Sequence, residues 1–314
     1  MGSSDALARL AADRTSGARA IAAGCRAVLR EYALSARADL GAGEYMDGLG
    51  ALAARIARLR PPMALLSRLA SDLLAAVDRG AEAPAAELVA RTLEALEAQE
   101  RRAAEALDRI ARAGAAALAS AQTVLTVSRS GTVEAVLHRL ASQRKLRVIV
   151  SEGRPGGEGT LLAIDLAGRG IEVELVLDAA LPGRVRAAGA VLVGADAVSE
   201  AWFANKVGTY PVALAANLAD VPLFVAVEES KFLSAGVPFA GEERDPAEIL
   251  TGAPAGIRVS NAWFETTPLE LVASFLTNEG ILAPDNVQAR CRALSPTSSG
   301  CSGTGGSDRS TNRT

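Results

Sequence analysis

Apolar positions in the first 118 residues recur every three or four residues, a spacing that places them on one face of an α-helix. Good helix formers, above all Ala, Leu and Arg, dominate this part of the chain. Glycine and proline interrupt the pattern near residues 41–43, 60–62 and 80–84. The pattern therefore predicts about four helices, the last running from about residue 85 to 118.

The spacing changes after Gln122, where short β-branched runs begin to alternate with helical segments. The predicted strands are 123–127, 147–151, 172–177, 190–193 and 223–227. The predicted helices among and after them are 131–142, 159–169, 182–188, 211–219 and 268–278. Apolar strands separated by helices are typical of a parallel sheet covered on both faces.

The chain is thus expected to have an α/β fold in three parts. A helical N-terminal domain (1–120) precedes a Rossmann-like parallel-sheet domain that binds the ligand (121–294). The last residues, 295–314, are rich in Ser, Thr and Gly and predict a disordered tail.

The composition narrows the class of function. Apolar residues at 49% and charged residues at 22% describe a soluble globular protein, and a net charge of −3 argues against nucleic acid as a partner. No run of about 18 apolar residues is present, so no membrane contact is expected. Three cysteines without metal-site spacing, and no signal peptide, favour the cytoplasm. His138 is the single histidine, so we expect neither a histidine triad nor a multi-histidine metal site, and no metal or organic cofactor is required.

Polar side chains follow each of the five predicted strands at the point where the strand ends. They lie at residues 128–132, 152–159, 178, 196 and 228–231. The carboxyl ends of parallel strands share one edge of a sheet, and ligands bind at that edge in open α/β folds. The five turns are therefore expected to converge on one cleft.

Asp196 is the most informative of these residues, because residues 189–194 before it are apolar or glycine. Desolvation raises the pKa of such a carboxyl toward the range useful for proton transfer. The alternative is an aspartate that caps a following helix. Asn205 and Lys206 are expected to open the next helix and to favour a phosphate, whereas Asp178 is expected to be structural.

Two further turns are candidates for phosphate binding. Ser130, Gly131 and Thr132 directly precede a predicted helix, whose free N–H groups favour an anion. The alternative is an N-cap made by Ser128 or Ser130. In the second turn, Arg154 before a proline could direct its guanidinium at a phosphate, or could be a solvent-exposed arginine of an ordinary turn.

As a set, these motifs resemble the initiation factor 2B alpha/beta/delta family. The resemblance covers about residues 123–284 and touches the helical half at Gly17-Ala18 and Arg60-Pro61. The matching segments are Leu125-Thr126, Glu152-x-Arg154-Pro155-x-x-x-Gly159, Val176-Leu-Asp178-Ala-Ala180, Gly194-Ala-Asp196, Asn205-Lys206-x-Gly208-Thr209, Glu229-Ser230-Lys231-Phe232, Phe264-Glu265-Thr266-x-Pro268 and Gly280-Ile-Leu-x-Pro284.

The family includes regulatory subunits of a translation initiation factor and isomerases of methylthioribose 1-phosphate and ribose 1,5-bisphosphate. In the isomerases a cysteine of the first turn and the aspartate of Gly-Ala-Asp carry the proton transfers. The resemblance therefore implies that Ser128 and Asp196 are the catalytic residues. The implied substrate-binding residues are Arg60, Ser130, Gly131, Thr132, Arg154, Glu158, Asn205, Lys206 and Lys231.

Three departures from the isomerase pattern bear on the chemistry. Ser128 stands where the isomerases have cysteine, Ser16 where they have a phosphate-binding arginine, and Glu158 where glutamine is common. A hydroxyl has a far higher pKa than a thiol and cannot simply take over a thiolate's role. In the other direction, the regulatory subunits often lose the aspartate that this chain keeps as Asp196.

We therefore expect a sugar-phosphate-binding protein, an aldose-ketose isomerase of ribose 1-phosphate derivatives or a relative with altered chemistry. The alternative is a non-catalytic regulatory subunit that senses a nucleotide or sugar phosphate. The expected partners are a phosphorylated sugar or nucleotide and further copies of the chain, as a homodimer or higher homo-oligomer.

Overall fold

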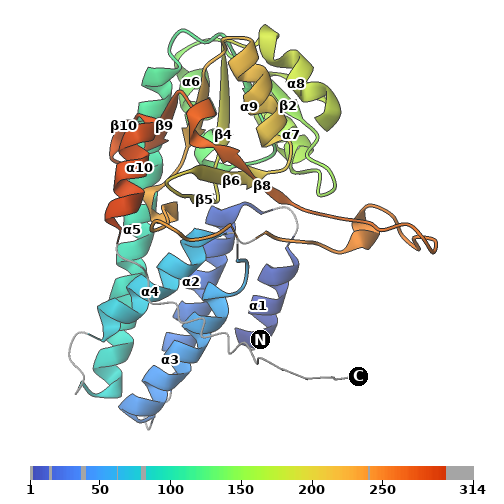
Figure 1. The fold of residues 1–314 in the computed structure, drawn as a ribbon. Coiled ribbons are helices and arrows are strands. Elements are labelled where there is room, and N and C mark those ends of the chain that lie inside the picture. Colours follow the sequence, from blue (N-terminus) through green and yellow to red (C-terminus); the bar gives the residue numbers. More distant parts are fainter. Residues whose placement is uncertain are drawn as a thin grey trace, which may run out of the picture.

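The computed structural model describes residues 3–13, 16–36, 40–61, 63–78, 83–239 and 241–294. The first part of the chain is helical, as predicted, and its helices pack into a bundle (Figure 1). The helices are α1 (Ser3–Ala12), α2 (Ala18–Leu34), α3 (Ala42–Ala57), α4 (Ala64–Val77) and α5 (Ala85–Ala117). The three predicted breaks are confirmed, and the sequence pattern missed a further one between α1 and α2. Gly17, in extended conformation, precedes α2 there, and the backbone N–H of Ser16 donates to the carboxylate of Asp13.

The second part is built on a seven-stranded sheet with the order β10-β9-β7-β4-β1-β2-β3. All neighbouring strands are parallel except β10, which pairs antiparallel with β9. The five predicted strands are confirmed with ends shifted by at most one residue. The strands are β1 (Thr123–Thr126), β2 (Arg147–Ser151), β3 (Glu172–Val176), β4 (Ala190–Gly194), β7 (Leu223–Ala226), β9 (Ser274–Thr277) and β10 (Gly280–Leu282).

Helices cover both faces of this sheet. One buried core lies between the sheet and α5, α6 (Gly131–Gln143) and α7 (Glu158–Gly168). The other lies between the sheet and α8 (Leu181–Arg184), α9 (Thr209–Leu218) and α10 (Pro284–Ala293). The fold is therefore α/β, with a helical part followed by a Rossmann-like, mostly parallel sheet. None of the helices that the structure describes is long and apolar enough to span a membrane.

The predicted helix at 268–278 is wrong. The segment instead holds the end of β8 (Phe264–Pro268), a 3-10 turn at Leu269–Leu271, and β9. Phe275 and Leu276 of β9 are both fully buried, one in each of the two cores. A short apolar run fits a helix or a strand equally well, and here parallel pairing with β7 decides for the strand.

A second, three-stranded sheet lies between the main sheet and the helical bundle (Figure 1). It consists of β5 (Ala197–Val198), β6 (Trp202–Lys206) and β8, all antiparallel. Asn205 and Lys206 close β6, so the prediction that they open a helix is wrong. The helix α9 begins only at Thr209, after Gly208 has turned the chain with a φ of 97°.

Helix α5 belongs to both parts of the molecule. It is 33 residues long, and Leu88 and Leu96 in its first half are buried in the core of the bundle. Ile110 and Ala115 in its second half are buried beneath the main sheet. The division into domains at residue 120 remains a prediction, and the predicted tail (295–314) lies outside the described residues.

Candidate active site

A cavity opens at the carboxyl edge of the parallel strands, where the main sheet, the small sheet and the helical bundle meet. It is lined by every predicted site residue except Arg154. These are Arg60, Ser128, Ser130, Gly131, Thr132, Glu158, Asp196, Asn205, Lys206 and Lys231. Four of the five strand-end turns therefore converge, as their positions in the sequence predicted.

The turn at Asp178 is the exception. Its carboxylate accepts hydrogen bonds from the backbone N–H groups of Gly153 (2.9 Å) and Arg154 (2.7 Å), so it fastens the loop after β2. The side chain of Arg154 is exposed and lies outside the cavity lining. Asp178 thus has the structural role expected of it, and Arg154 occupies the position of a solvent-exposed turn residue.

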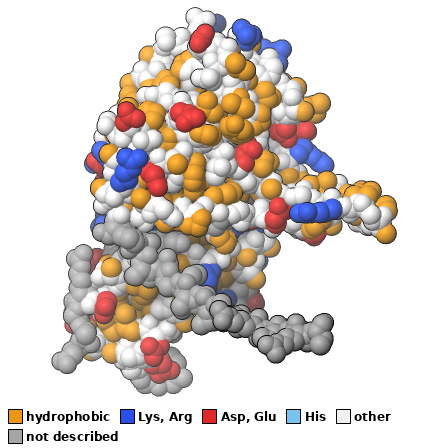
Figure 2. Space-filling model, viewed as in Figure 1, with side chains coloured by type: hydrophobic (Ala, Val, Ile, Leu, Met, Phe, Trp, Pro, Cys, Tyr) orange, Lys and Arg blue, Asp and Glu red, His pale blue; other side chains and the backbone are white. Residues whose placement is uncertain are grey.

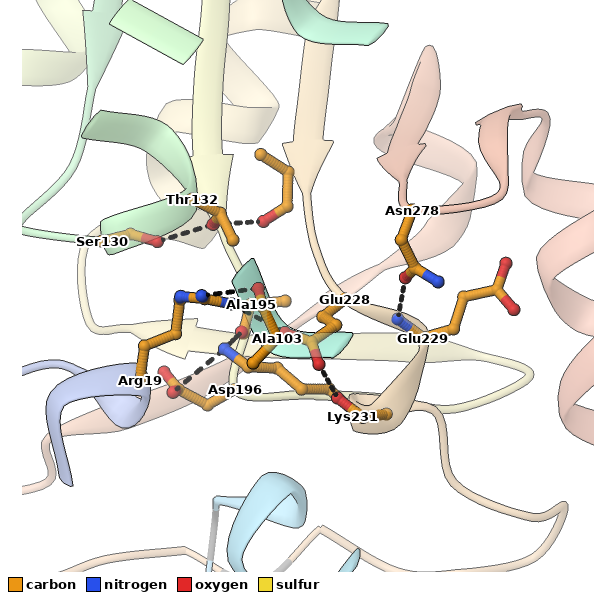
Figure 3. A network of polar contacts seen from close by, with 12 residues as sticks. Arg19, Ala103, Ser130, Thr132, Ala195, Asp196, Glu228, Glu229, Lys231 and Asn278 are labelled. Carbon is orange, nitrogen blue, oxygen red and sulfur yellow. Dashed lines mark hydrogen bonds and ion pairs between the residues drawn. The ribbon is translucent and has the colours of Figure 1, made fainter. Parts of the chain in front are cut away.

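Asp196 and Lys231 form the charged centre of the cavity (Figure 3). The Lys231 Nζ lies 3.9 Å from an Asp196 carboxylate oxygen and also donates to the carbonyl of Ala195. Burial raises the pKa of Asp196, and the charges of Lys231, Arg60 and Lys206 oppose this shift. Burial likewise lowers the pKa of Lys231, against the charge of Asp196. The strand β5 follows Asp196, so this aspartate does not cap a helix.

Lys206 is held on two sides. Its Nζ lies 3.1 Å from Glu158 Oε1, and 3.5 Å from the centre of the Trp263 ring, within range of a cation–π contact. Both members of the Lys206–Glu158 pair are buried, and burial lowers the pKa of Lys206 while Glu158 raises it. The second carboxylate oxygen of Glu158 is buried and has no hydrogen-bond partner among the described residues.

The first turn presents the start of α6 to the cavity. Ser130 is the N-cap residue by position, but its side chain makes no capping hydrogen bond and instead contacts the Thr132 hydroxyl at 2.9 Å. The Thr132 hydroxyl in turn donates to the carbonyl of Ala226 (2.7 Å) (Figure 3). The first N–H groups of α6 are therefore not capped by Ser130, which is the condition for binding an anion there.

Two backbone features shape this turn. Ser128 has a φ of 58°, a conformation that costs free energy for a non-glycine residue and that is found disproportionately at functional sites. A Cβ at Gly194 would lie 2.4 Å from the Ser130 Oγ. Only glycine at 194 therefore lets the first turn approach the end of β4, next to Asp196.

Arg60 joins the cavity to the helical bundle. Its side chain is 3% exposed and donates to the carbonyls of Leu10, Ala11 and Asp13 around the end of α1. Its Nε is buried without a partner among the described residues. Burial, together with the nearby Arg244, lowers the pKa of Arg60.

Arg19 and Trp263 are among the lining residues that sequence reasoning missed. The Arg19 guanidinium donates to Glu228 (2.7 Å) and to the carbonyl of Ala103 (2.8 Å) (Figure 3). Both missed residues stand next to matched motifs: Arg19 follows Gly17-Ala18, and Trp263 precedes Phe264. Their position beside these motifs could have identified them as residues of the site.

The cavity combines two carboxyl groups, Asp196 and Glu158, with several cations. Such a set can bind a phosphate and exchange a proton with an oxygen of a bound molecule. Among the described residues no cluster of His, Cys, Asp and Glu suits a metal ion. No described cysteine lines the cavity, and burial raises the pKa of Cys25 to about 11 and of Cys291 to about 12. Neither thiol can therefore replace the cysteine that the isomerases carry at the position of Ser128.

Comparison with known proteins agrees with this geometry. A model of the Initiation factor 2 subunit family matches residues 14–284. A 5-deoxyribose 1-phosphate isomerase of Moorella thermoacetica is 37% identical over 203 residues, which cover 58% of this chain and 58% of that protein. A putative translation initiation factor eIF-2B subunit 2-like protein of Pyrococcus abyssi is 34% identical over 241 residues, covering 76% of this chain and 82% of that protein.

The fold is similar to solved structures as well. The crystal structure of 5-methylthioribose 1-phosphate isomerase from Pyrococcus horikoshii superposes with a TM-score of 0.77 at 25% identity. The match covers 92% of this chain and 87% of that one, so it includes the helical bundle as well as the main sheet.

Proposed function

We propose that this chain, which belongs to the Initiation factor 2 subunit family, is a sugar-phosphate isomerase. The substrate is an aldose ribose 1-phosphate derivative, the product is the corresponding ketose, and the site of action is the cytoplasm. The observation that carries the proposal is Asp196, a carboxyl whose pKa is raised by burial in a cavity lined with cations. The activity named for the Moorella relative is of this class.

In the proposed site the phosphate lies against the start of α6, between Lys206 and Lys231. The uncapped N–H groups of the helix and the two ammonium groups are the donors it needs. The sugar then extends toward Asp196. Arg154 stays a predicted phosphate contact only if the exposed loop that carries it moves over the bound ligand.

The reaction opens the sugar ring and moves two hydrogens. One passes from carbon 2 to carbon 1, and the proton of the carbon-2 hydroxyl passes to the ring oxygen. We assign the oxygen-bound proton to Asp196, whose raised pKa suits both acceptance and donation. Ser128 or a water molecule that it holds serves the carbon centres, because the hydroxyl itself is too weak an acid to replace a thiol.

The direct test is an assay of the full chain with three aldose phosphates: ribose 1-phosphate, 5-deoxyribose 1-phosphate and methylthioribose 1-phosphate. Proton NMR should show the loss of the anomeric signal of at least one substrate and the appearance of the ketose. Calorimetric titration of the same compounds separates binding from turnover. Tight binding of all three without any ketose would reject the isomerase and leave a sensor of sugar phosphates.

Replacing Glu158 with Gln is expected to tighten the binding of ribose 1-phosphate about tenfold at pH 7. Glu158 pairs with Lys206 at 3.1 Å, so an incoming phosphate must compete with it for the ammonium group. One hydrogen bond to a charged group contributes about 1.5–3 kcal/mol. A change of about 1.4 kcal/mol in binding free energy already corresponds to a factor of ten in Kd. The matched control is Glu172→Gln, which changes an exposed carboxylate outside the cavity and should leave the Kd unchanged. Weaker binding in Glu158→Gln would mean that Glu158 contacts the sugar instead.

We also propose that the chain forms a homo-oligomer. Figure 2 shows hydrophobic side chains gathered on the surface over α9. Leu218 is 78% exposed there, and Tyr210 and Leu214 are each 39% exposed. A contiguous apolar surface of this kind is typical of a protein–protein contact. Light scattering should give at least twice the monomer mass, and Leu218→Glu with Leu214→Glu should reduce it to that of one chain.

A further inference from the structure

A second hollow, a groove of about 520 Å³, lies beside the candidate active site between α2, α4 and α5. Arg19 lines both the groove and the catalytic cavity. Four further arginines line the groove: Arg26, Arg68, Arg102 and Arg109. We propose that this groove is a second ligand site, which binds a small phosphorylated anion separately from the substrate.

Arg26 is the strongest element of the site. The side chain is half-buried, and its Nε is buried without a hydrogen-bond partner among the described residues. Among the described residues no carboxylate lies within ion-pair distance of its guanidinium, since Glu100 pairs with Arg30 and Glu228 with Arg19. Burial lowers the pKa of Arg26, and the charges of Glu100 and Glu228 oppose this shift from farther away. Buried polar groups nearly always have partners, and each exception calls for an explanation such as an absent ion. A bound anion in the groove would supply the partner.

The carboxylates that line the groove form no ion pair with Arg26. Two of its acids are engaged, Glu228 with Arg19 (2.7 Å) and Glu279 with Arg109 (3.9 Å). The other two, Asp72 and Glu105, are exposed at the rim.

Arg68 and Arg102 make no ion pair among the described residues. Together with Arg26 they give three guanidinium groups without an ion pair around one hollow, against two rim carboxylates, Asp72 and Glu105. Guanidinium groups bind phosphate oxygens through paired hydrogen bonds, which gives the site its chemical class.

Gln99 adds an acceptor to these donors. Its Nε2 donates to the carbonyl of Leu69, while its Oε1 is buried without a partner among the described residues. The ligand that satisfies the whole groove therefore carries a phosphate and a hydroxyl or amino group. Such a ligand is a phosphate ester, whereas inorganic pyrophosphate satisfies only the arginines and serves as the simplest probe.

The test is calorimetric titration of the full chain with pyrophosphate, in the parent and in two groove variants, Arg26→Gln and Arg68→Gln. Arg26→Gln is expected to weaken binding about tenfold, the effect of losing one charged hydrogen bond. Arg68 has no buried atom that lacks a partner, so its variant should fold normally and weaken binding by a smaller factor. The control Arg101→Gln changes an exposed arginine of α5 that lies outside the groove, and it should bind as the parent does.

A further variant separates the two sites. Lys206→Ala removes a cation of the catalytic cavity and should leave pyrophosphate binding in the groove intact. Unchanged affinity in both groove variants, or loss of all binding in Lys206→Ala, would assign the anion to the catalytic cavity and overturn the proposal. No binding to the parent at millimolar pyrophosphate would overturn it as well. None of these titrations depends on isomerase activity, so the result is independent of the function proposed above.

Discussion

Replacing Asp196 with Asn is expected to lower the kcat of the isomerisation about 10²–10⁴-fold, while the Kd of the sugar phosphate stays nearly unchanged. The amide has the shape of the carboxyl but cannot exchange the proton that passes between the sugar oxygens. The change therefore removes an interaction of the transition state and leaves those of the ground state. Steady-state kinetics with the best substrate, together with calorimetric titration, measures both quantities.

Two further variants make this result specific. Asp165→Asn removes a surface carboxylate near His138 and should keep full activity. Ser128→Cys restores the thiol that the isomerases carry and should retain or raise the turnover. Robust activity in Asp196→Asn would reject Asp196 as the acid and base. Absence of turnover in both the parent and Ser128→Cys, with binding intact, would identify a sensor.

Replacing Lys231 with Met is expected to move the acidic limb of the kcat/KM–pH profile to higher pH and to lower kcat/KM at least about tenfold. The charge of Lys231 opposes the effect of burial on the pKa of Asp196, so its removal lets that pKa rise further. The carboxylate form then appears only at higher pH. The loss of rate reflects one charged contact with the substrate, about 1.5–3 kcal/mol. Profiles of the parent, Lys231→Met and the exposed-site control Lys145→Met give the comparison.

The same shift has a consequence for stability. Because the pKa of Asp196 is higher in the folded chain than in the unfolded one, the folded chain holds this proton more tightly. The contribution of Asp196 to stability is therefore lost as the pH rises from the ordinary aspartate pKa to the raised one. In Lys231→Met this loss should extend to higher pH, as thermal unfolding at a series of pH values will show. If the acidic limb of the kcat/KM–pH profile lay at the same pH in the parent and in Lys231→Met, the pairing of Lys231 with Asp196 would be contradicted.

Five strands of the main sheet were predictable from local pattern because apolar and β-branched residues fill them and polar turns follow them. Four of the five are mostly buried, and only β3, at the edge of the sheet, is more exposed. The segment 268–278 was not, since its apolar residues face two different cores and only pairing with β7 distinguishes a strand from a helix. The small sheet was missed for a similar reason. Its strands β5, β6 and β8 are short, and β6 and β8 pair across about sixty residues of sequence.

In the candidate site, too, some features could be predicted from the sequence and others could not. Asp196 and Lys231 were found because each follows a strand at the carboxyl edge of the predicted sheet. Lys206 was found through its Asn-Lys motif, although it closes β6 and does not open a helix. The contacts that set their chemistry were not predictable, since Lys206 meets Glu158 and Trp263 only in the folded chain. Arg19 was missed because its place beside the cavity depends on how the helical bundle docks on the sheet.

The shared helix α5 limits how this protein can be recombined with its relatives. Leu96 of α5 is buried in the core of the helical bundle, whereas Ile110 of the same helix is buried in the core beneath the main sheet. A chimera joined at residue 120 would place a foreign helix under the native α6 and leave Val136, which closely approaches Gly114, against an unmatched surface. A crossover inside α5, between these two groups of buried residues, would keep each core with its own partners. The boundary between the core of the bundle and the core beneath the sheet thus lies within α5, between Leu96 and Ile110.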